Sequence, residues 1–225
     1  NKITKELTPT YGSIQKLFTR DNDLLAFCED KVVRIYADKD IIYNADGNTN
    51  VTATNKVLGQ SHPFEGEFGI SKNPESFASE SFRVYFTDKN RRSVLRLSKD
   101  GITRISDYGM SDWFSDNMSG ASELLGSFDY DKQEYNLKGV EDKVVSFSES
   151  VRGWTSFKSF TPMEHGISLS NNYYTFKMGA PYIHHDEDVA KNTFYGTYIP
   201  SSVTVILNEA PDIVKNFKTL FYDGT

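Results

Sequence analysis

The stretch FRVYFTDKNRRSVLRLSKDGITRIS, residues 82–106, decides the fold class. It holds three short runs, FRVYFT, SVLRLS and ITRIS, that are rich in β-branched and aromatic residues. Such runs are typical of strands when polar turns close them, and the second turn, Lys-Asp-Gly, has a glycine that accepts positive φ. The stretch therefore predicts a three-stranded antiparallel meander.

Similar groups of strand-like runs fill most of the remaining chain, and the 13 Tyr and 16 Phe residues also favour strands. Helical patterns are few: a short helix over residues 110–117, capped by Ser111, and one turn over residues 210–216. The other runs expected to form strands are residues 13–19, 24–28, 31–36, 124–129, 133–137, 143–148, 154–160, 173–177, 181–184, 192–197, 202–208 and 217–222. The fold class predicted is all-β with few short helices.

A loose repeat suggests how these meanders are arranged. FCEDK, FTDKN, FDYDK and YTFKMG open turns at intervals of about 59, 42 and 46 residues, and periods of about 40–50 residues are the scale of propeller blades. We therefore expect a β-propeller-like array of antiparallel meanders, with a β-sandwich as the alternative. The 225 residues are expected to form a single all-β domain, with room for a weak subdivision near residues 110–123. Because the chain starts at Asn1, we expect a fragment of a longer protein.

Composition narrows the range of functions. The net charge of −6 gives no electrostatic case for a surface that holds nucleic acid or an acidic membrane. No apolar run approaches the ~20 residues that a membrane span needs. The single cysteine, Cys28, rules out an intrachain disulfide framework and is expected to be a buried strand residue.

The serine-rich stretch SFSESVRGWTSFKSFTP, residues 146–162, raises the question of a reactive serine. Alternation in a strand places Val145 and Phe147 on one face and Ser146 and Ser148 on the other. The serines then form the solvated or cross-strand face of a hairpin. Gly-x-Ser-x-Gly, P-loop, GxGxxG and HExxH motifs do not occur. We expect no catalytic residues, no cofactor and no enzymatic activity.

Two polar clusters are rich in the residue types that bind ions. HHDED, at residues 184–188, is dense in ligand types, but adjacent strand residues face opposite sides, so His184 and His185 do not easily share one ion. The segment at residues 44–50 resembles a calcium loop but lacks the EF-hand spacing of glycine and glutamate. We read both as polar loops and expect no metal site.

Three segments are candidates for contact with other subunits. Residues 68–77 form a loop punctuated by glycine and proline with aromatic ends, which we expect to pack on the body. An aromatic pair lies in the short helix, and the end of the chain combines a proline turn with aromatic residues. The candidate interface residues are Phe68, Pro74, Phe77, Trp113, Phe114, Pro211, Phe217 and Tyr222.

Long stretches of the chain resemble large tail-associated structural proteins of tailed bacteriophages, of the nozzle or muzzle type found in marine and crAss-like gut phages. Four stretches carry the resemblance: LLAFCEDKVVRIYADKDIIYNADGN, VLGQSHPFEGEFGISKNPESFA, VRGWTSFKSFTP and SSVTVILNEAPDIVKNFKTLFYDGT. The resemblance extends to residues 82–110 and to the NNYYTFK and NTFYG stretches.

The resemblance implies a virion location in the phage tail and partners among the other tail proteins. It further implies a homo-oligomeric ring in the parent protein, with DNA passing transiently through the assembly. It supplies no catalytic motif. The function expected is a non-enzymatic structural module of a tail nozzle, muzzle or hub, acting through subunit contacts.

Two other functions stay open from the sequence. A receptor- or glycan-binding module would use exposed tyrosines from the set Tyr173, Tyr174, Tyr182, Tyr195 and Tyr198. A polysaccharide depolymerase would need two carboxylates about 5–10 Å apart in a cleft. Clustered exposed tyrosines would favour the first, and a deep acidic cleft would favour the second.

Overall fold

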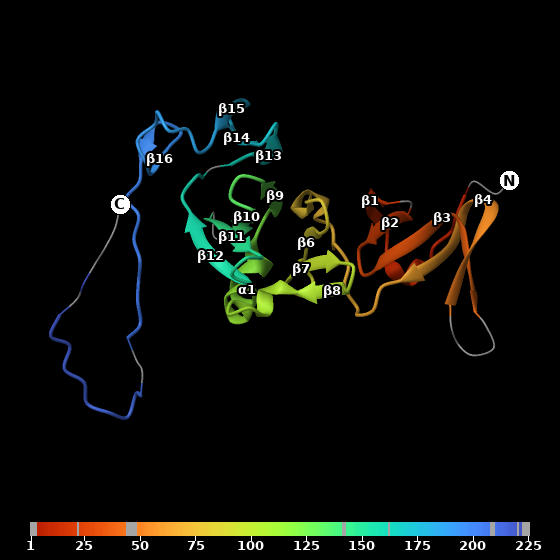
Figure 1. Cartoon of the computed structure of the whole chain (residues 1–225), viewed down its shortest axis with the longest axis horizontal. Coiled ribbons are helices and arrows are strands. Elements are labelled where there is room, and N and C mark those ends of the chain that lie inside the picture. The colour runs from red at the N-terminus through yellow and green to blue at the C-terminus, as the bar shows by residue number, and fades with distance from the viewer. Residues whose placement is uncertain are drawn as a thin grey trace.

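The computed structural model describes residues 4–21, 23–43, 49–140, 143–161, 163–207, 210–219 and 221. The described chain is almost entirely antiparallel β-structure, with one short α-helix, α1, at Ser111–Asn117. Figure 1 shows a row of small sheets that follow one another in chain order. The predicted all-β array of antiparallel meanders is confirmed, while closure into a ring of blades stays a prediction.

Each sheet is a meander whose strand order follows the chain. The first sheet contains β1 (Ile14–Arg20), β2 (Asp23–Cys28), β3 (Val32–Tyr43) and β4 (Thr49–Pro63). The second contains β5 (Ala78–Ser79), β6 (Val84–Asp88), β7 (Ser93–Ser98) and β8 (Gly101–Arg104). The third contains β9 (Leu125–Asp129), β10 (Glu134–Val140), β11 (Lys143–Ser148) and β12 (Gly153–Lys158). The fourth contains β13 (His165–Leu169), β14 (Asn172–Lys177) and β15 (Ala180–Ile183), and β16 (Thr193–Phe194) and β17 (Thr197–Tyr198) form a small hairpin.

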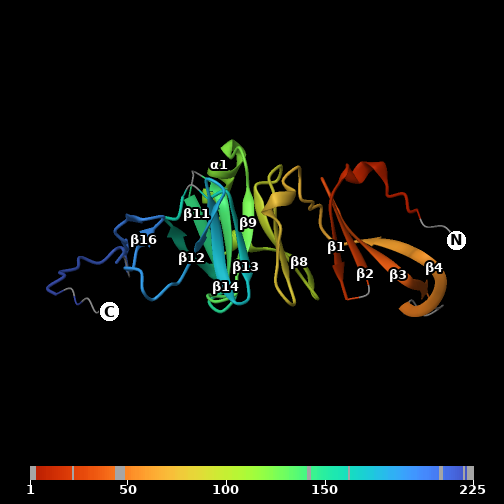
Figure 2. The same ribbon diagram turned by 90° about the horizontal axis from the view of Figure 1, so that it is seen from above.

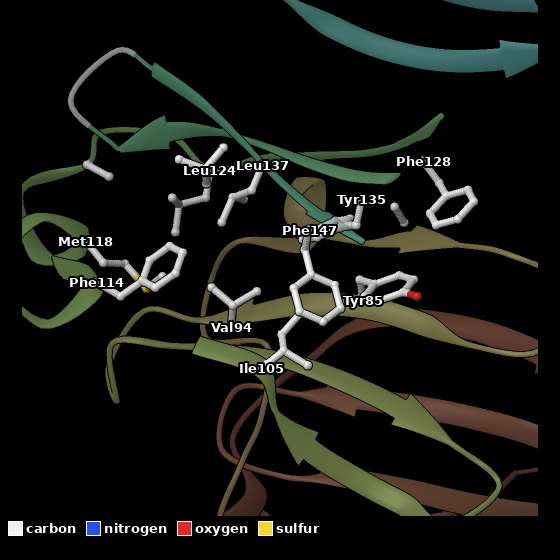
Figure 3. Close-up of a cluster of buried hydrophobic side chains, with 13 residues drawn as sticks. Tyr85, Val94, Ile105, Phe114, Met118, Leu124, Phe128, Tyr135, Leu137 and Phe147 are labelled. Atoms are coloured by element: carbon white, nitrogen blue, oxygen red, sulfur yellow. The ribbon is translucent and has the colours of Figure 1, made fainter. Parts of the chain in front are cut away.

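Successive sheets pack face to face, because alternate side chains of one strand serve two neighbours. In β6, Tyr85 faces the third sheet, while Val84 and Phe86 face the first. The cluster between the second and third sheets is built around stacked Tyr85 and Tyr135, whose ring centroids lie 4.9 Å apart (Figure 3). Sheet-on-sheet packing thus buries both faces of the strands β6, β7, β9 and β11.

A similar but smaller cluster joins the third and fourth sheets. Leu125 and Val144 from the third sheet meet Tyr173 from β14, and Phe160 and Met163 fill the space beside them. Figure 2 shows β13 and β14 lying over β9, in agreement with the 2.8 Å hydrogen bond that Ser168 Oγ donates to the Phe128 carbonyl. The stacking order therefore continues into the fourth sheet.

Close backbone approach requires glycine at one position between two sheets. A Cβ atom on Gly126 in β9 would overlap the Ser76 carbonyl oxygen, which belongs to the loop before β5. Tyr135 fixes the same loop, because its hydroxyl donates a 2.8 Å hydrogen bond to that carbonyl. The sequence therefore encodes the tight contact between the second and third sheets with one glycine and one buried tyrosine.

Several sequence expectations need correction. Residues 202–207 and 217–219 form no strand, and residues 192–197 form only part of the β16–β17 hairpin. Strand β13 was not expected, and the first and second sheets each have one strand more than the predicted meanders. Residues 210–213 form a turn, not a helix, closed by the Ile213 amide donating to the Ala210 carbonyl. Ser111 is the first residue of α1, and Met110 is the N-cap, which makes no side-chain cap.

The serines of β11 lie on the face opposite Val145 and Phe147, as alternation predicts, but they are buried and not solvated. Ser146 Oγ donates a 2.6 Å hydrogen bond to Asn136 Oδ1 across the β10–β11 pair. The fourth sheet covers this face, which a single strand pattern does not reveal. Cys28 is buried in β2, as expected.

Candidate interaction surfaces

The loop at residues 68–77 packs on the body, as its apolar ends predict. Phe77 lies against Phe18 and Phe27, with ring centroids 5.1 and 5.3 Å apart, and Phe68 joins the same cluster between the first and second sheets. Pro74 begins a one-turn 3-10 helix at Pro74–Ser76 and is half-buried. These residues hold two sheets of the chain together, and contact with another subunit stays a prediction for their exposed edges.

The aromatic pair in α1 divides between core and surface. Phe114 is fully buried in the cluster between the second and third sheets, so it offers no surface to a partner. Trp113 is half-buried and packs edge-on against Phe157, with ring centroids 5.3 Å apart. The helical period places neighbouring residues on different faces of α1, and the inward position belongs to Phe114.

The C-terminal candidates lie apart from the other two groups. Pro211 is exposed, and Phe217 is 66% exposed to solvent. Tyr222 lies outside the described residues. In Figure 1 residues 201–207 run away from the stacked sheets. The structure therefore places the candidate residues that it describes in three separate regions, not in one surface.

The HHDED segment contributes to a polar contact between the third and fourth sheets. His185 Nε2 lies 2.7 Å from Oδ2 of the buried Asp129, and His184 Nε2 lies 2.7 Å from Thr175 Oγ1. Burial in the first place, and then the nearby His185, lower the pKa of His184 to about 4. The two imidazoles thus serve different partners. Asp129 was missed because it precedes His185 by 56 residues and no local pattern links them.

No group of three or more His, Cys, Asp or Glu side chains is arranged to hold a metal ion in the described ranges. The tyrosines considered for sugar stacking are also divided. Tyr173 is buried with its hydroxyl 2.7 Å from Ser127 Oγ, and the Tyr195 hydroxyl lies 2.8 Å from Thr175 Oγ1. Only Tyr182 and Tyr198 of the five are exposed.

A surface hollow of about 590 Å³ lies between the second and third sheets. Two acidic residues, Asp100 and Glu149, are among those that line it. Glu149 is held by Arg96 at 2.7 Å and also accepts a 3.1 Å hydrogen bond from the Tyr85 hydroxyl. Burial, followed by the Glu149 charge, raises the pKa of Tyr85. These contacts tie one sheet to the next, and they engage the Glu149 carboxylate in an ion pair.

Comparison with known proteins gives the family. A model of the Crassvirus muzzle protein matches residues 4–179, and a model of the Crassvirus muzzle protein C-terminal domain matches residues 189–225. The chain belongs to the Crassvirus muzzle protein family. The resemblance noted from the sequence is therefore confirmed.

One curated relative is the muzzle protein of Bacteroides phage crAss001, which is 25% identical over 226 residues. The alignment covers 96% of this chain but only 16% of that relative. Among solved structures, a Bacteroides thetaiotaomicron structural genomics protein of unknown function matches 77% of this chain and 41% of its own. Its TM-score is 0.40 at 14% sequence identity. None of the described helices has the length and apolar character to cross a membrane.

Proposed function

We propose that this chain is a non-enzymatic structural and assembly module of a phage tail nozzle, muzzle or hub, and that it acts through subunit contacts. Family membership supports a virion role. The observation that carries the assembly role is the contrast between a densely stacked body and an exposed apolar C-terminal end. Val203, Val214 and Phe221 are each at least 85% exposed, although side chains of this kind are normally buried.

The stacked body suits a rigid support. Side chains from both neighbours bury the faces of the second and third sheets, and Glu149 connects them through Arg96 and Tyr85. Interiors packed in this way have low compressibility and transmit force. A tail component needs this stiffness to keep its contact surfaces in place.

We further propose that the parent protein assembles as a homo-oligomeric ring with other tail proteins as neighbours, and that DNA passes transiently through the assembly. A ring requires heterologous interfaces that close on themselves. The net charge of −6 supports passage, because basic surfaces hold phosphates and an acidic wall lets DNA slide.

Localisation on purified virions tests this proposal directly. Antibodies raised against the 225-residue chain should label the tail in electron micrographs, and antibodies against a capsid protein serve as the control. Absence of tail label on intact and mildly disrupted particles would overturn the structural role. The non-enzymatic part is tested by incubating the chain with host polysaccharide, where release of reducing ends would contradict it.

A further inference from the structure

The fourth sheet is held less firmly than the sheets before it. Among the described residues, the apolar cluster that joins it to the third sheet has five buried members, against thirteen in the cluster between the second and third sheets. Its other side faces solvent, where Ile167 is 48% exposed and Ile183 is 46% exposed. Elements with few buried contacts open at a lower free energy than the rest of a fold. The fourth sheet is therefore a part of the stack that can open while the sheets before it stay folded.

A polar contact between His185 and Asp129 helps to hold this sheet in place. His185 Nε2 lies 2.7 Å from Oδ2 of the buried Asp129, which belongs to β9 of the third sheet. Asp129 also has partners in its own turn, since its Oδ1 accepts hydrogen bonds from the backbone amides of Asp131 and Lys132. The turn of the third sheet therefore keeps its own hydrogen bonds when His185 moves away.

The chain reaches this contact through an unfavourable backbone conformation. His185 has a φ of 64°, in the left-handed region that residues with a Cβ atom rarely adopt. Such a conformation persists only where the surrounding contacts hold it. The two family matches end at residue 179 and begin again at residue 189, so the HHDED segment lies at the junction between them. This segment thus fixes the point at which the chain leaves the fourth sheet.

His184 occupies a largely apolar site that suits its neutral form. The centroid of its ring lies 4.7 Å from that of Phe160 and 5.2 Å from that of Tyr173. Its Nε2 lies 2.7 Å from Thr175 Oγ1, and it forms no ion pair with any residue that the structure describes. A charged imidazole in this site loses its hydration and gains no carboxylate in return. Docking of the fourth sheet therefore favours a neutral His184.

The charges around His184 do not offset this effect of burial. His185 and Lys158 disfavour a positive charge on His184, and Asp129 favours one. Asp129 is already in contact with His185, and Glu134, the acid nearest to Lys158, lies 2.9 Å from its ammonium group. Burial is the largest effect, and the pKa of His184 is lowered to about 4. In a released sheet the same imidazole is hydrated and takes up a proton at about pH 6.5.

We propose that β13–β15 form a flap on the third sheet, and that acid releases this flap when His184 takes up a proton. The sheets before it stay folded. Phe194 packs against the same small cluster, so the β16–β17 hairpin leaves with the flap. A proton on His185 strengthens its contact with Asp129, so the releasing group is His184 and not its neighbour. This inference concerns a conformational change within one chain and does not rest on the proposed tail role.

Amide hydrogen exchange of the full chain between pH 7 and pH 4 tests the flap. After correction for the intrinsic effect of pH on exchange, the protection of residues 165–183 should fall about 100-fold over this range, because the released form binds the proton more tightly. Residues 84–97 of the second sheet should remain at least about tenfold better protected at pH 4, since they exchange only when more of the fold opens. Mass spectrometry of peptides from the two segments measures both values.

Two histidine variants identify the releasing group. His184→Gln keeps a polar side chain near Thr175 and should reduce the effect of pH on residues 165–183 to less than about threefold. His165→Gln is the matched control, because His165 lies in the same sheet but is exposed at the start of β13. This control should keep the pH dependence of the wild-type chain.

Three outcomes would overturn the proposal. Constant protection of residues 165–183 down to pH 4 would show that acid does not release the sheet. Equal protection of residues 165–183 and 84–97 at every pH would show that the fourth sheet opens only with the whole fold. An unchanged pH dependence in His184→Gln would assign the effect to another group. The wild-type series decides the first two points by itself, so the test does not depend on how well a variant folds.

Discussion

The third and fourth sheets show how the same local pattern leads to different surroundings. Strand β11 reads KVVSFS and β13 reads HGISL, and both alternate apolar and small or polar residues. In β11 both faces are buried, whereas in β13 Ile167 and Leu169 are exposed. Alternation therefore identifies a strand, but the presence of a neighbouring layer determines whether each face is covered.

The largest expected effect is on a buried phenylalanine, and it is compared with an exposed phenylalanine in the neighbouring strand. Phe147 in β11 is buried against Trp154 and Tyr85, so Phe147→Ala should lower the free energy of unfolding by about 3–5 kcal/mol. Phe157 in β12 is 50% exposed, and Phe157→Ala should cost about 1 kcal/mol. Urea unfolding of both variants measures the difference. Equal losses would contradict the assignment of this cluster as the main core.

Substitutions at two glycines test how tightly the third sheet packs against the second sheet and against the fourth sheet. Gly126→Ala would push a Cβ against the Ser76 carbonyl, which is backbone and yields little, so we expect a loss of about 3 kcal/mol. In Gly166→Ala the new Cβ meets the side-chain oxygens of Tyr173 and Ser127 at 2.6 and 2.7 Å. Side chains relax more easily, so about 1–2 kcal/mol is expected. A reversed order in thermal or urea unfolding would show that the interface with the fourth sheet is the stiffer one.

Acid should weaken the interface with the fourth sheet through His184. Its pKa is about 4 in the folded chain, below the usual 6.5, so the unfolded chain binds the extra proton first. Stability should therefore fall as the pH decreases from about 6.5 to 4, by about 3 kcal/mol, and this contribution should stay constant below 4. His184→Gln should flatten that part of the pH profile and retain a polar group near Thr175. Parallel profiles for the two proteins would refute the role of His184.

The smallest effect is expected in residues 202–207, which form no strand. Val205 is 65% exposed, so Val205→Ser should change the free energy of unfolding of dilute chain by less than about 0.5 kcal/mol. Val145 in β11 is buried, so the same substitution there, Val145→Ser, serves as the matched change and should clearly lower the free energy of unfolding. Urea unfolding at low chain concentration checks both. A loss above about 1 kcal/mol for Val205→Ser would mean that residues 202–207 pack on the sheets of the same chain.

Most strands were predictable because their signals are local. The runs at residues 93–98 and 143–148 coincide with β7 and β11, since two-residue alternation and polar turns are sufficient to define them. Strand β13 was missed because its short HGISL pattern has no aromatic residue and follows an irregular stretch. Residues 202–208 have a strand pattern, but a strand requires a hydrogen-bonding neighbour, and residues 202–207 have none in the described structure.

The candidate surface residues were less predictable for a related reason. Phe114 and Trp113 are adjacent and equally apolar, and only the packing of α1 on the sheets decides that Phe114 is buried. The link from Asp129 to His185 joins residues far apart in the sequence, so a single sequence offers no signal for it. Burial and pairing at such positions depend on distant segments that fold alongside them.

By itself, the sequence determined the all-β class, the antiparallel meanders and the resemblance to muzzle proteins. Strand periodicity, turn chemistry and stretches of sequence similar to a family can all be read from short segments of the chain. Only the tertiary structure decided that Ser146 is buried, that Gly126 must lack a side chain, and that Ile167 and Ile183 face solvent. These properties arise where one sheet meets the next, and the apolar surface that a sheet buries depends on the layer placed against it.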